Sequence, residues 1–200
     1  MKYYSYNINN FTDEEYESIF FSLPEKLKDK VWKMVKTVNR KLTVMGYILL
    51  KNGLKNDYDI DIEELIIKEN KYGKPIITNI NNLYYNISHS KDMVVCAISD
   101  KEIGIDVSYI KNVNIKLAKQ FCNKEEVKYI TSSKGYLRTL FKIFSLKESY
   151  IKMLGKSLMD IKNIEVITGG NSLTIKSEYN IRISFIENID DYVISICEIF

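Results

Sequence analysis

The sequence predicts an α+β fold in which two subdomains meet near residue 100. The chain has 200 residues, of which 46% are hydrophobic and 28% charged, and this is enough for a real core in one domain or two small subdomains. Each half of the chain contains both strand-like alternation and helix-like spacing of apolar residues. Strands and helices mixed in both halves favour the α+β class.

The first half is expected to begin with a strand at 3–8, followed by a helical region. Pro24, a residue favoured in the first helical turn, opens this region, and Gly53 is expected to end it. Apolar residues recur at helical spacing within it, namely Leu27, Val31, Met34 and Val38. Further strands are expected at 65–68, 84–87 and 93–99.

The second half is expected to contain the same kinds of elements. A strand at 103–108 opens it, and helical segments follow at 115–130 and 136–154. The remaining strands are expected at 164–167, 172–176, 181–186 and 192–199.

Composition excludes several classes of protein. The longest apolar run, at 44–50, is too short to span a bilayer, and the amino terminus has no apolar core, so a cytoplasmic protein without membrane contact is expected. Three cysteines without CxxC spacing argue against a disulfide framework or a zinc site and favour reduced, buried thiols: Cys96, Cys122 and Cys197.

Basic side chains crowd into residues 26–41, although the net charge of the chain is only +3. We expect this segment to form an anion-attracting surface, and a solvated helix face is the alternative. A nucleic-acid partner is not expected, because aromatic residues are not interleaved with these charges in a stacking pattern.

The strand IGIDVS carries an aspartate on the face opposite its apolar residues. Side chains alternate along a strand, so the apolar residues lie on one face and the other three on the opposite face: Gly104, Asp106 and Ser108. Gly104 leaves room for a bulky group to approach the backbone. Taken alone, this strand is better explained by an Asp at the edge of a strand that merely ends it.

A second acid lies on the helix FSLKESYIKML, where Glu148 and Lys152 are four residues apart on one face and Gly155 ends the helix. The simpler interpretation is a surface ion pair worth roughly 0.2–0.5 kcal/mol. The sharper hypothesis is that Glu148 joins Asp106 to hold a hard divalent cation, and that Lys152 contacts a phosphate bound to the same cation.

Four blocks, YGKP, NISHS, GIDV and FSLKESYIK, give the chain a resemblance over residues 71–158 to 4'-phosphopantetheinyl transferases of the surfactin-synthetase (Sfp) type. Such enzymes transfer the phosphopantetheine arm of coenzyme A to a serine of an apo acyl or peptidyl carrier protein and release 3',5'-ADP, with Mg²⁺. The resemblance implies two pseudo-symmetric halves, 1–100 and 101–200, each a small, mainly antiparallel sheet packed on helices. Coenzyme A and Mg²⁺ are expected between the halves, in a monomer.

The resemblance also implies roles for individual residues. Those expected to bind coenzyme A are Lys26, Lys28, Arg40, Lys74, Pro75, Ser88, His89 and Lys152. Asp106 and Glu148 are expected to hold Mg²⁺, with His89 on the 3'-phosphate and Lys74 as a cation near the nucleotide.

A carrier serine is hard to deprotonate, so a carboxylate general base is expected. Glu148 is the first candidate, and Glu126 in FCNKEEVKY is the second. Glu126 is also readily explained as a solvated helix residue.

Ser108 departs from the family pattern, which has Glu two residues after the strand Asp. A hydroxyl is a weaker Mg²⁺ ligand than a carboxylate, but Mg²⁺ readily keeps waters, so a water held by Ser108 can fill the position. We therefore expect a working enzyme with weaker metal affinity. The alternative is a non-catalytic relative that binds coenzyme A or a carrier protein.

Other classes fit the sequence poorly. A serine or cysteine hydrolase needs its base beside the nucleophile, whereas Ser88 and Ser90 flank the only histidine on a strand and point away from it.

An acidic carrier domain is expected to dock on residues 113–133, which carry Lys116, Lys119 and Lys124.

Overall fold

The computed structural model describes residues 1–169, 172–186, 189 and 191–200. Short 3-10 helices are labelled η. The first half contains β1 (Lys2–Asn7), η1 (Ile8–Asn10), α1 (Asp13–Ser22), α2 (Glu25–Trp32), α3 (Thr37–Tyr58), η2 (Ile62–Glu64), β2 (Ile67–Glu69), β3 (Pro75–Ile77), β4 (Tyr84–Ser90) and β5 (Met93–Ser99). The second half contains β6 (Ile103–Tyr109), η3 (Ile115–Gln120), α4 (Lys124–Ser132), α5 (Tyr136–Leu154), η4 (Leu158–Asn163), β7 (Val166–Gly169), β8 (Ser172–Ile175), β9 (Ile181–Ile186) and β10 (Tyr192–Ile199).

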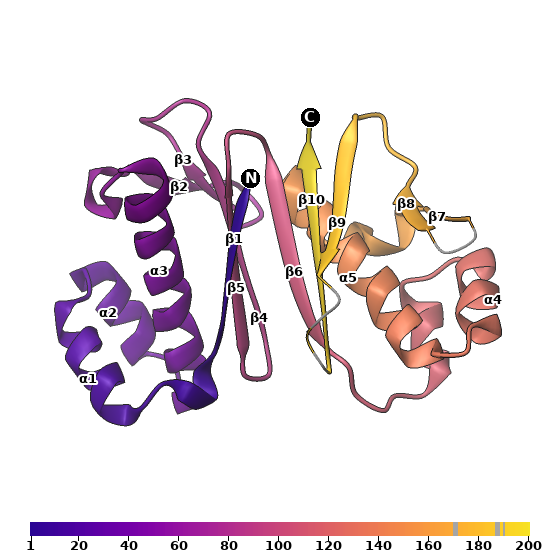
Figure 1. The fold of residues 1–200 in the computed structure, drawn as a ribbon, viewed down its shortest axis with the longest axis horizontal. Coiled ribbons are helices and arrows are strands. Elements are labelled where there is room, and N and C mark those ends of the chain that lie inside the picture. Colours follow the sequence, from indigo (N-terminus) through magenta and orange to yellow (C-terminus); the bar gives the residue numbers. More distant parts are fainter. Residues whose placement is uncertain (170–171, 187–188, 190) are drawn as a thin grey trace.

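Figure 1 shows four main layers: helices α1–α3, a sheet of order β1-β5-β4, a sheet of order β6-β10-β9, and helices α4 and α5. Strand pairs β2-β3 and β7-β8 form two further, two-stranded sheets. All strand pairs in both sheets are antiparallel. Each half is therefore a small antiparallel sheet packed on helices, and the predicted α+β class is confirmed.

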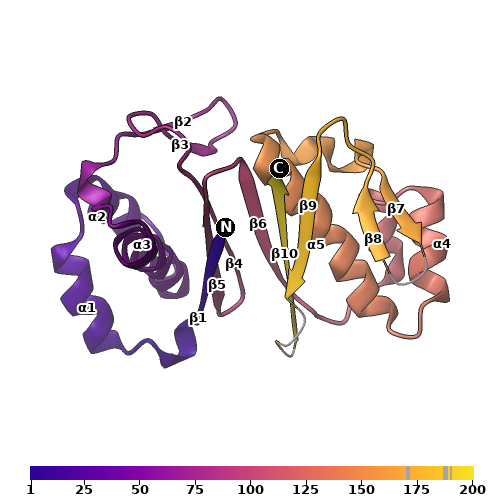
Figure 2. The same cartoon turned by 45° about the horizontal axis from the view of Figure 1, so that its top comes forward.

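The two sheets pack against each other through apolar faces (Figure 2). Alternate residues of a strand share a face, so one set from each of three strands forms this contact. The set consists of Met93, Val95 and Ala97 on β5, Ile103, Ile105 and Val107 on β6, and Tyr192, Ile194 and Ile196 on β10. Burial of this apolar surface holds the halves together and leaves the outer faces of the sheets for helices.

Helix α3 packs closely on the outer face of the first sheet. A Cβ atom at Gly53 would lie 2.5 Å from a ring carbon of Tyr4 and 2.9 Å from Cδ1 of Ile98. Gly53 therefore permits helix–sheet contact, and the prediction that it ends the helix is wrong. The helix continues to Tyr58 and closes at Asp59, whose backbone is left-handed with a φ of 51°.

Capping signals define two helices that hydrophobic spacing did not resolve. Thr12 and Glu15 form a capping box at the start of α1, which the periodicity missed. A second capping box, between Asn123 and Glu126, starts α4, so the helix expected at 115–130 is instead η3 followed by α4. Helix α5 and strand β10 occupy the expected residues. In the part of the chain that the structure describes, no helix is long and apolar enough to cross a membrane.

Candidate active site

Asp106 lies among polar side chains where the two sheets meet. Its side chain is 4% exposed, and its Oδ1 atom accepts hydrogen bonds from the Lys152 ammonium at 2.6 Å and the Ser88 hydroxyl at 3.0 Å. Ser108 donates to the other oxygen, Oδ2, at 3.0 Å. Glu148 Oε2 lies 3.6 Å from the Lys152 nitrogen. We call these five residues the carboxylate centre.

Gly104 allows α5 to reach β6 and form this centre. A Cβ atom at Gly104 would lie 2.0 Å from the Ser149 carbonyl oxygen and 2.3 Å from the Met153 amide nitrogen. The expectation that Gly104 admits a bulky neighbour is confirmed, and the neighbour is the backbone of α5. This close approach places Glu148 and Lys152 beside the strand that carries the acid.

The two carboxylates differ in pKa. Burial, followed by the negative charge of Asp106, raises the pKa of Glu148 to about 7, although Lys152 opposes the shift. Burial also acts to raise the pKa of Asp106, but the Lys152 ammonium and hydrogen bonds from Lys152, Ser145 and Ser88 prevail and lower it. At neutral pH, Asp106 is ionised and Glu148 can exchange a proton, as a general base must.

The oxygen donors of this centre suit a hard divalent cation. Among the residues that the structure describes, no group of three or more His, Cys, Asp or Glu residues could hold a metal. Mg²⁺ needs fewer protein ligands, because it keeps several waters and is commonly held by one or two carboxylates together with substrate phosphates. The hydrogen bond to Asp106 confirms that Ser108 faces the same side, so Asp106, Glu148 and Ser108 fit Mg²⁺ as a partial ligand set.

His89, next to Ser88 on β4, is exposed at the rim of the centre. Partial desolvation and then the charge of Lys152 lower the pKa of the imidazole, whereas Asp106 opposes the shift. Because neighbouring residues of a strand point to opposite faces, Ser88 reaches Asp106 while His89 stays available to a ligand.

The turn KYGKP packs against the carboxyl end of α5. The Lys74 ammonium donates hydrogen bonds to Glu102 Oε2 and to the Met153 carbonyl oxygen, both at 2.6 Å. Asn70 donates to the Gly155 carbonyl oxygen at 2.9 Å. In this structure the charge of Lys74 is paired with Glu102 and bridges the two halves, and its expected role as a cation for coenzyme A stays a prediction.

The basic residues expected to meet the 3'-phosphate end lie on the outer helices. The Arg40 guanidinium donates to the carbonyl oxygens of Trp32, at the end of α2, and Met34, in the α2–α3 connection, and lies 5.5 Å from the centre of the Trp32 ring. Lys28 pairs with Glu25 at 3.0 Å, and Lys26 is exposed on α2. The sheet β1-β5-β4 separates α2 from β6 in Figure 1, so these residues form a group apart from the carboxylate centre.

Glu126 is buried in a different cluster. Its Oε2 atom accepts hydrogen bonds from the Lys147 ammonium at 2.7 Å and from the Asn123 amide at 2.9 Å, and its Oε1 accepts one from the Val166 amide at 2.7 Å. The side chains of Glu126 and Lys147 are 0% exposed. The expectation that Glu126 is a solvated helix residue is wrong, because its side chain is completely buried; its role as a general base stays a prediction, which this burial disfavours.

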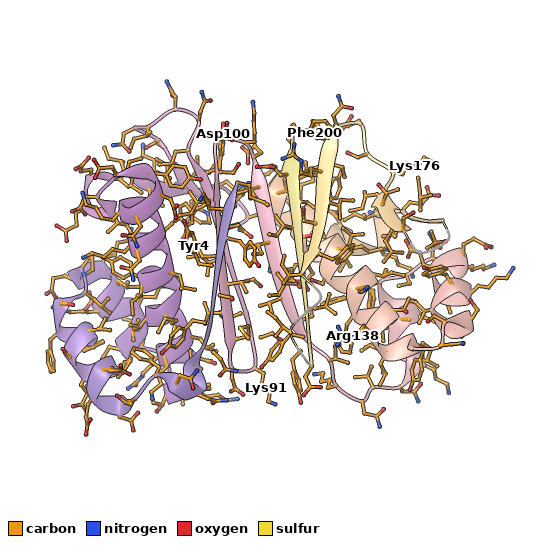
Figure 3. The ribbon with its side chains drawn as sticks, viewed as in Figure 1. Tyr4, Lys91, Asp100, Arg138, Lys176 and Phe200 are labelled. Atoms are coloured by element: carbon orange, nitrogen blue, oxygen red, sulfur yellow. The ribbon has the colours of Figure 1, made fainter. Side chains whose placement is uncertain are left out.

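Two cavities lie along β6 and α5. The first, of 240 Å³, is lined by Asn70, Lys74, Pro75, Glu102, Met153 and Gly155, and we call it the β3 cavity. The second, of 520 Å³, is lined by Lys91, Ser108, Lys111, Leu117, Phe121 and Phe144 among others, and we call it the η3 cavity. Figure 3 labels Lys91, which lines the η3 cavity, at the lower edge of the molecule, and Asp100, two residues before Glu102 of the β3 cavity, at the upper edge. The carboxylate centre therefore lies between a cavity at each end of β6.

Sequence patterns do not indicate the roles of Lys147 and Glu102, whose side chains form ion pairs with Glu126 and Lys74. Each pair joins residues distant in the chain. A hydrophobic helix face that contains a lysine is the only local sign that Lys147 is buried, and it does not identify the partner.

The fold consists of two sheet-and-helix halves with a carboxylate centre between them, and comparison with known proteins identifies the family. Residues 102–197 match the family model of the 4'-phosphopantetheinyl transferase superfamily, and residues 10–101 match that of the 4'-phosphopantetheinyl transferase N-terminal region. The chain is 31% identical to 4'-phosphopantetheinyl transferase gsp of Aneurinibacillus migulanus, over 86% of this chain and 76% of the relative. It is 30% identical to 4'-phosphopantetheinyl transferase Sfp of Bacillus subtilis (strain 168), over 79% and 72%. The chain belongs to the 4'-phosphopantetheinyl transferase superfamily.

Proposed function

We propose that the chain transfers the 4'-phosphopantetheine arm of coenzyme A to a serine of an apo acyl or peptidyl carrier protein, giving the holo carrier and 3',5'-ADP. The observation that carries this proposal is the carboxylate centre, in which Asp106, Glu148 and Lys152 meet between the two halves. The names of the relatives support the reaction type. One chain supplies the whole site, so a monomer suffices.

Coenzyme A would lie across the boundary between an N-terminal nucleotide side, 1–100, and a C-terminal catalytic side, 101–200. Pro75 and the bridging Lys74 line the β3 cavity, which would receive part of the nucleotide. His89 would contact a phosphate at the rim of the centre, because its imidazole is exposed there. The cations of α2 and early α3 would attract the 3'-phosphate end: Lys26, Lys28 and Arg40.

Asp106, Glu148 and Ser108 would hold Mg²⁺, with Ser108 acting directly or through a water. When bound, Mg²⁺ neutralises negative charge on the diphosphate, which otherwise repels a nucleophile. Lys152, only 24% exposed at its side chain, contributes a second positive charge to the same group. Positioning and charge stabilisation supply most of the rate enhancement in phosphoryl transfer of this kind.

Glu148 would accept the proton of the attacking carrier serine. Its carboxylate lies in the carboxylate centre beside Lys152, whereas Glu126, the other candidate, is buried. The η3 cavity lies beside Ser108, has aromatic walls and carries Lys91 and Lys111 at its edge. These features suit an acidic carrier domain whose serine must reach the carboxylate centre.

Because Ser108 replaces the glutamate of the family pattern, one alternative is still tested: a non-catalytic relative that binds coenzyme A or a carrier protein. The retained Glu148 and Lys152 favour the enzyme, because a binding module has little need of a charged pair beside Asp106.

The proposal is tested by incubating the chain with coenzyme A, Mg²⁺ and an apo carrier domain, and measuring 3',5'-ADP by chromatography. The transferase releases one 3',5'-ADP for each carrier modified, and none without carrier. Binding of coenzyme A without release of 3',5'-ADP would support the non-catalytic relative instead.

A further inference from the structure

Strands β4 and β6 meet along a ladder of side-chain-to-backbone hydrogen bonds. Strand β6 is the edge of its sheet, and the amide groups on a strand edge need acceptors when they are buried. Three polar side chains of β4 accept from three amides of β6 at 2.9, 3.4 and 3.0 Å: Asn86 from Ile105, Ser88 from Val107, and Ser90 from Tyr109. Each pair is 19 residues apart, so the strands run parallel.

Ser88 is the member of this ladder whose hydroxyl also meets the carboxylate centre. It donates to Asp106 Oδ1 at 3.0 Å and accepts from the Lys152 ammonium at 2.8 Å. The residue is 6% exposed. One hydroxyl from the first half of the chain thus joins an acid and an ammonium from the second half.

These contacts fix the orientation of the acid. Asp106 Oδ1 is shared by Ser88 and Lys152, and Oδ2 is held by Ser108. Without Ser88, Oδ1 would keep the ammonium as its partner, and the carboxylate would lose the hydroxyl that holds its plane. Partners that orient a ligating carboxylate affect cation binding strongly, although they do not touch the cation.

We propose that Ser88 is a positioning residue that acts through Asp106 and Lys152, so that docking of the two halves completes the cation site. This inference rests on the proposed function and changes the role that the family resemblance implies for Ser88. A residue that binds a phosphate of coenzyme A directly would affect coenzyme A affinity first. Loss of a positioning residue would instead lower cation affinity more than coenzyme A affinity.

The test is titration with Mn²⁺, followed by electron paramagnetic resonance, with and without saturating coenzyme A and in the absence of carrier. We expect Ser88→Ala to weaken Mn²⁺ binding by roughly 10-fold and to lower kcat similarly, with little change in the KM for coenzyme A. Ser88→Thr, which keeps the hydroxyl, should restore Mn²⁺ binding. Asn86→Ala, which removes a neighbouring ladder acceptor, is the matched control and should bind Mn²⁺ normally.

Ser88→Cys, close to serine in volume, gives a second test if the alanine variant does not fold, and it should also weaken Mn²⁺ binding. Native Mn²⁺ affinity with a raised KM for coenzyme A in Ser88→Ala or Ser88→Cys would overturn the inference, as would equal losses in Asn86→Ala. A native chain that binds no Mn²⁺ in either condition would also overturn it. A chain that binds Mn²⁺ in the expected pattern but releases no 3',5'-ADP would contradict only the proposed transfer reaction.

Discussion

The Lys147 ammonium lies 2.7 Å from Glu126 Oε2, and both side chains are completely buried between α4, α5 and β7. The Lys147 nitrogen also donates to the Phe121 carbonyl oxygen at 2.8 Å. Lys147 precedes Glu148 by one residue on α5, whereas Glu126 lies on α4, so the pair anchors the segment that carries Glu148.

Breaking this pair should destabilise the protein. Lys147→Met leaves Glu126 buried without its counter-ion, and we expect the free energy of unfolding to fall by about 3–5 kcal/mol in urea denaturation. The double variant Lys147→Met with Glu126→Gln removes both charges and should recover part of that loss. A Glu126→Gln variant that keeps native stability but has no transfer activity would instead indicate a catalytic Glu126.

Replacing Gly104 should separate α5 from β6. Gly104→Ala places a methyl group against helix backbone, which cannot move aside as a flexible side chain can. We expect a loss of about 1–3 kcal/mol or more in the free energy of unfolding, together with loss of transfer activity. Gly135→Ala is the control, since no atom lies within 4 Å of a Cβ built there. Equal stability of the two variants would contradict the close packing.

Glu148 should make the stability of the metal-free protein depend on pH. Its folded-state pKa of about 7 lies above the ordinary value of 4.5, so the folded chain binds this proton more tightly than the unfolded chain. The resulting stability is present below the ordinary pKa and is lost as pH rises through about 7. The thermal unfolding midpoint of the native protein in EDTA should therefore fall more from about pH 5 to about pH 8 than that of Glu148→Gln. Parallel curves would contradict the raised pKa.

Reversing charges beside the η3 cavity should weaken carrier docking. The three lysines of η3 and early α4 are exposed: Lys116, Lys119 and Lys124. With all three changed to Glu, the KM for an acidic carrier should rise about tenfold at low salt, because each exposed pair contributes roughly 0.5 kcal/mol. Reversal at Lys51 and Lys68, exposed on α3 and β2, is the control. Unchanged carrier binding in the triple variant would place docking elsewhere.

Much of the candidate site could be predicted from local patterns. Alternation along IGIDVS places Asp106 and Ser108 on one face, and helical spacing places Glu148 and Lys152 together. These rules depend on neighbours in sequence, and the structure brings all four residues into contact or close approach.

The roles of Lys74 and Glu126 could not be predicted, because each depends on a partner far away in the chain. A basic or acidic residue in a motif has the same local signal whether its charge is offered to a ligand or paired in the interior. Gly53 shows the same limit in the fold. A glycine that stops a helix and one that admits a neighbouring strand look alike in sequence, and contact with Tyr4 and Ile98 distinguishes them.

The most direct measurement is the intact mass of an apo carrier domain after incubation with coenzyme A, Mg²⁺ and either the native chain, Asp106→Ala or Ser108→Glu. Ser108 borders the η3 cavity, so the longer glutamate has room there. We expect the native chain and Ser108→Glu each to add one phosphopantetheine to the carrier, and Asp106→Ala to add none. The Ser108→Glu variant should do so at a lower Mg²⁺ concentration than the native chain. No mass gain with the native chain, but transfer by Ser108→Glu, would contradict the account and show that the serine has silenced a former enzyme.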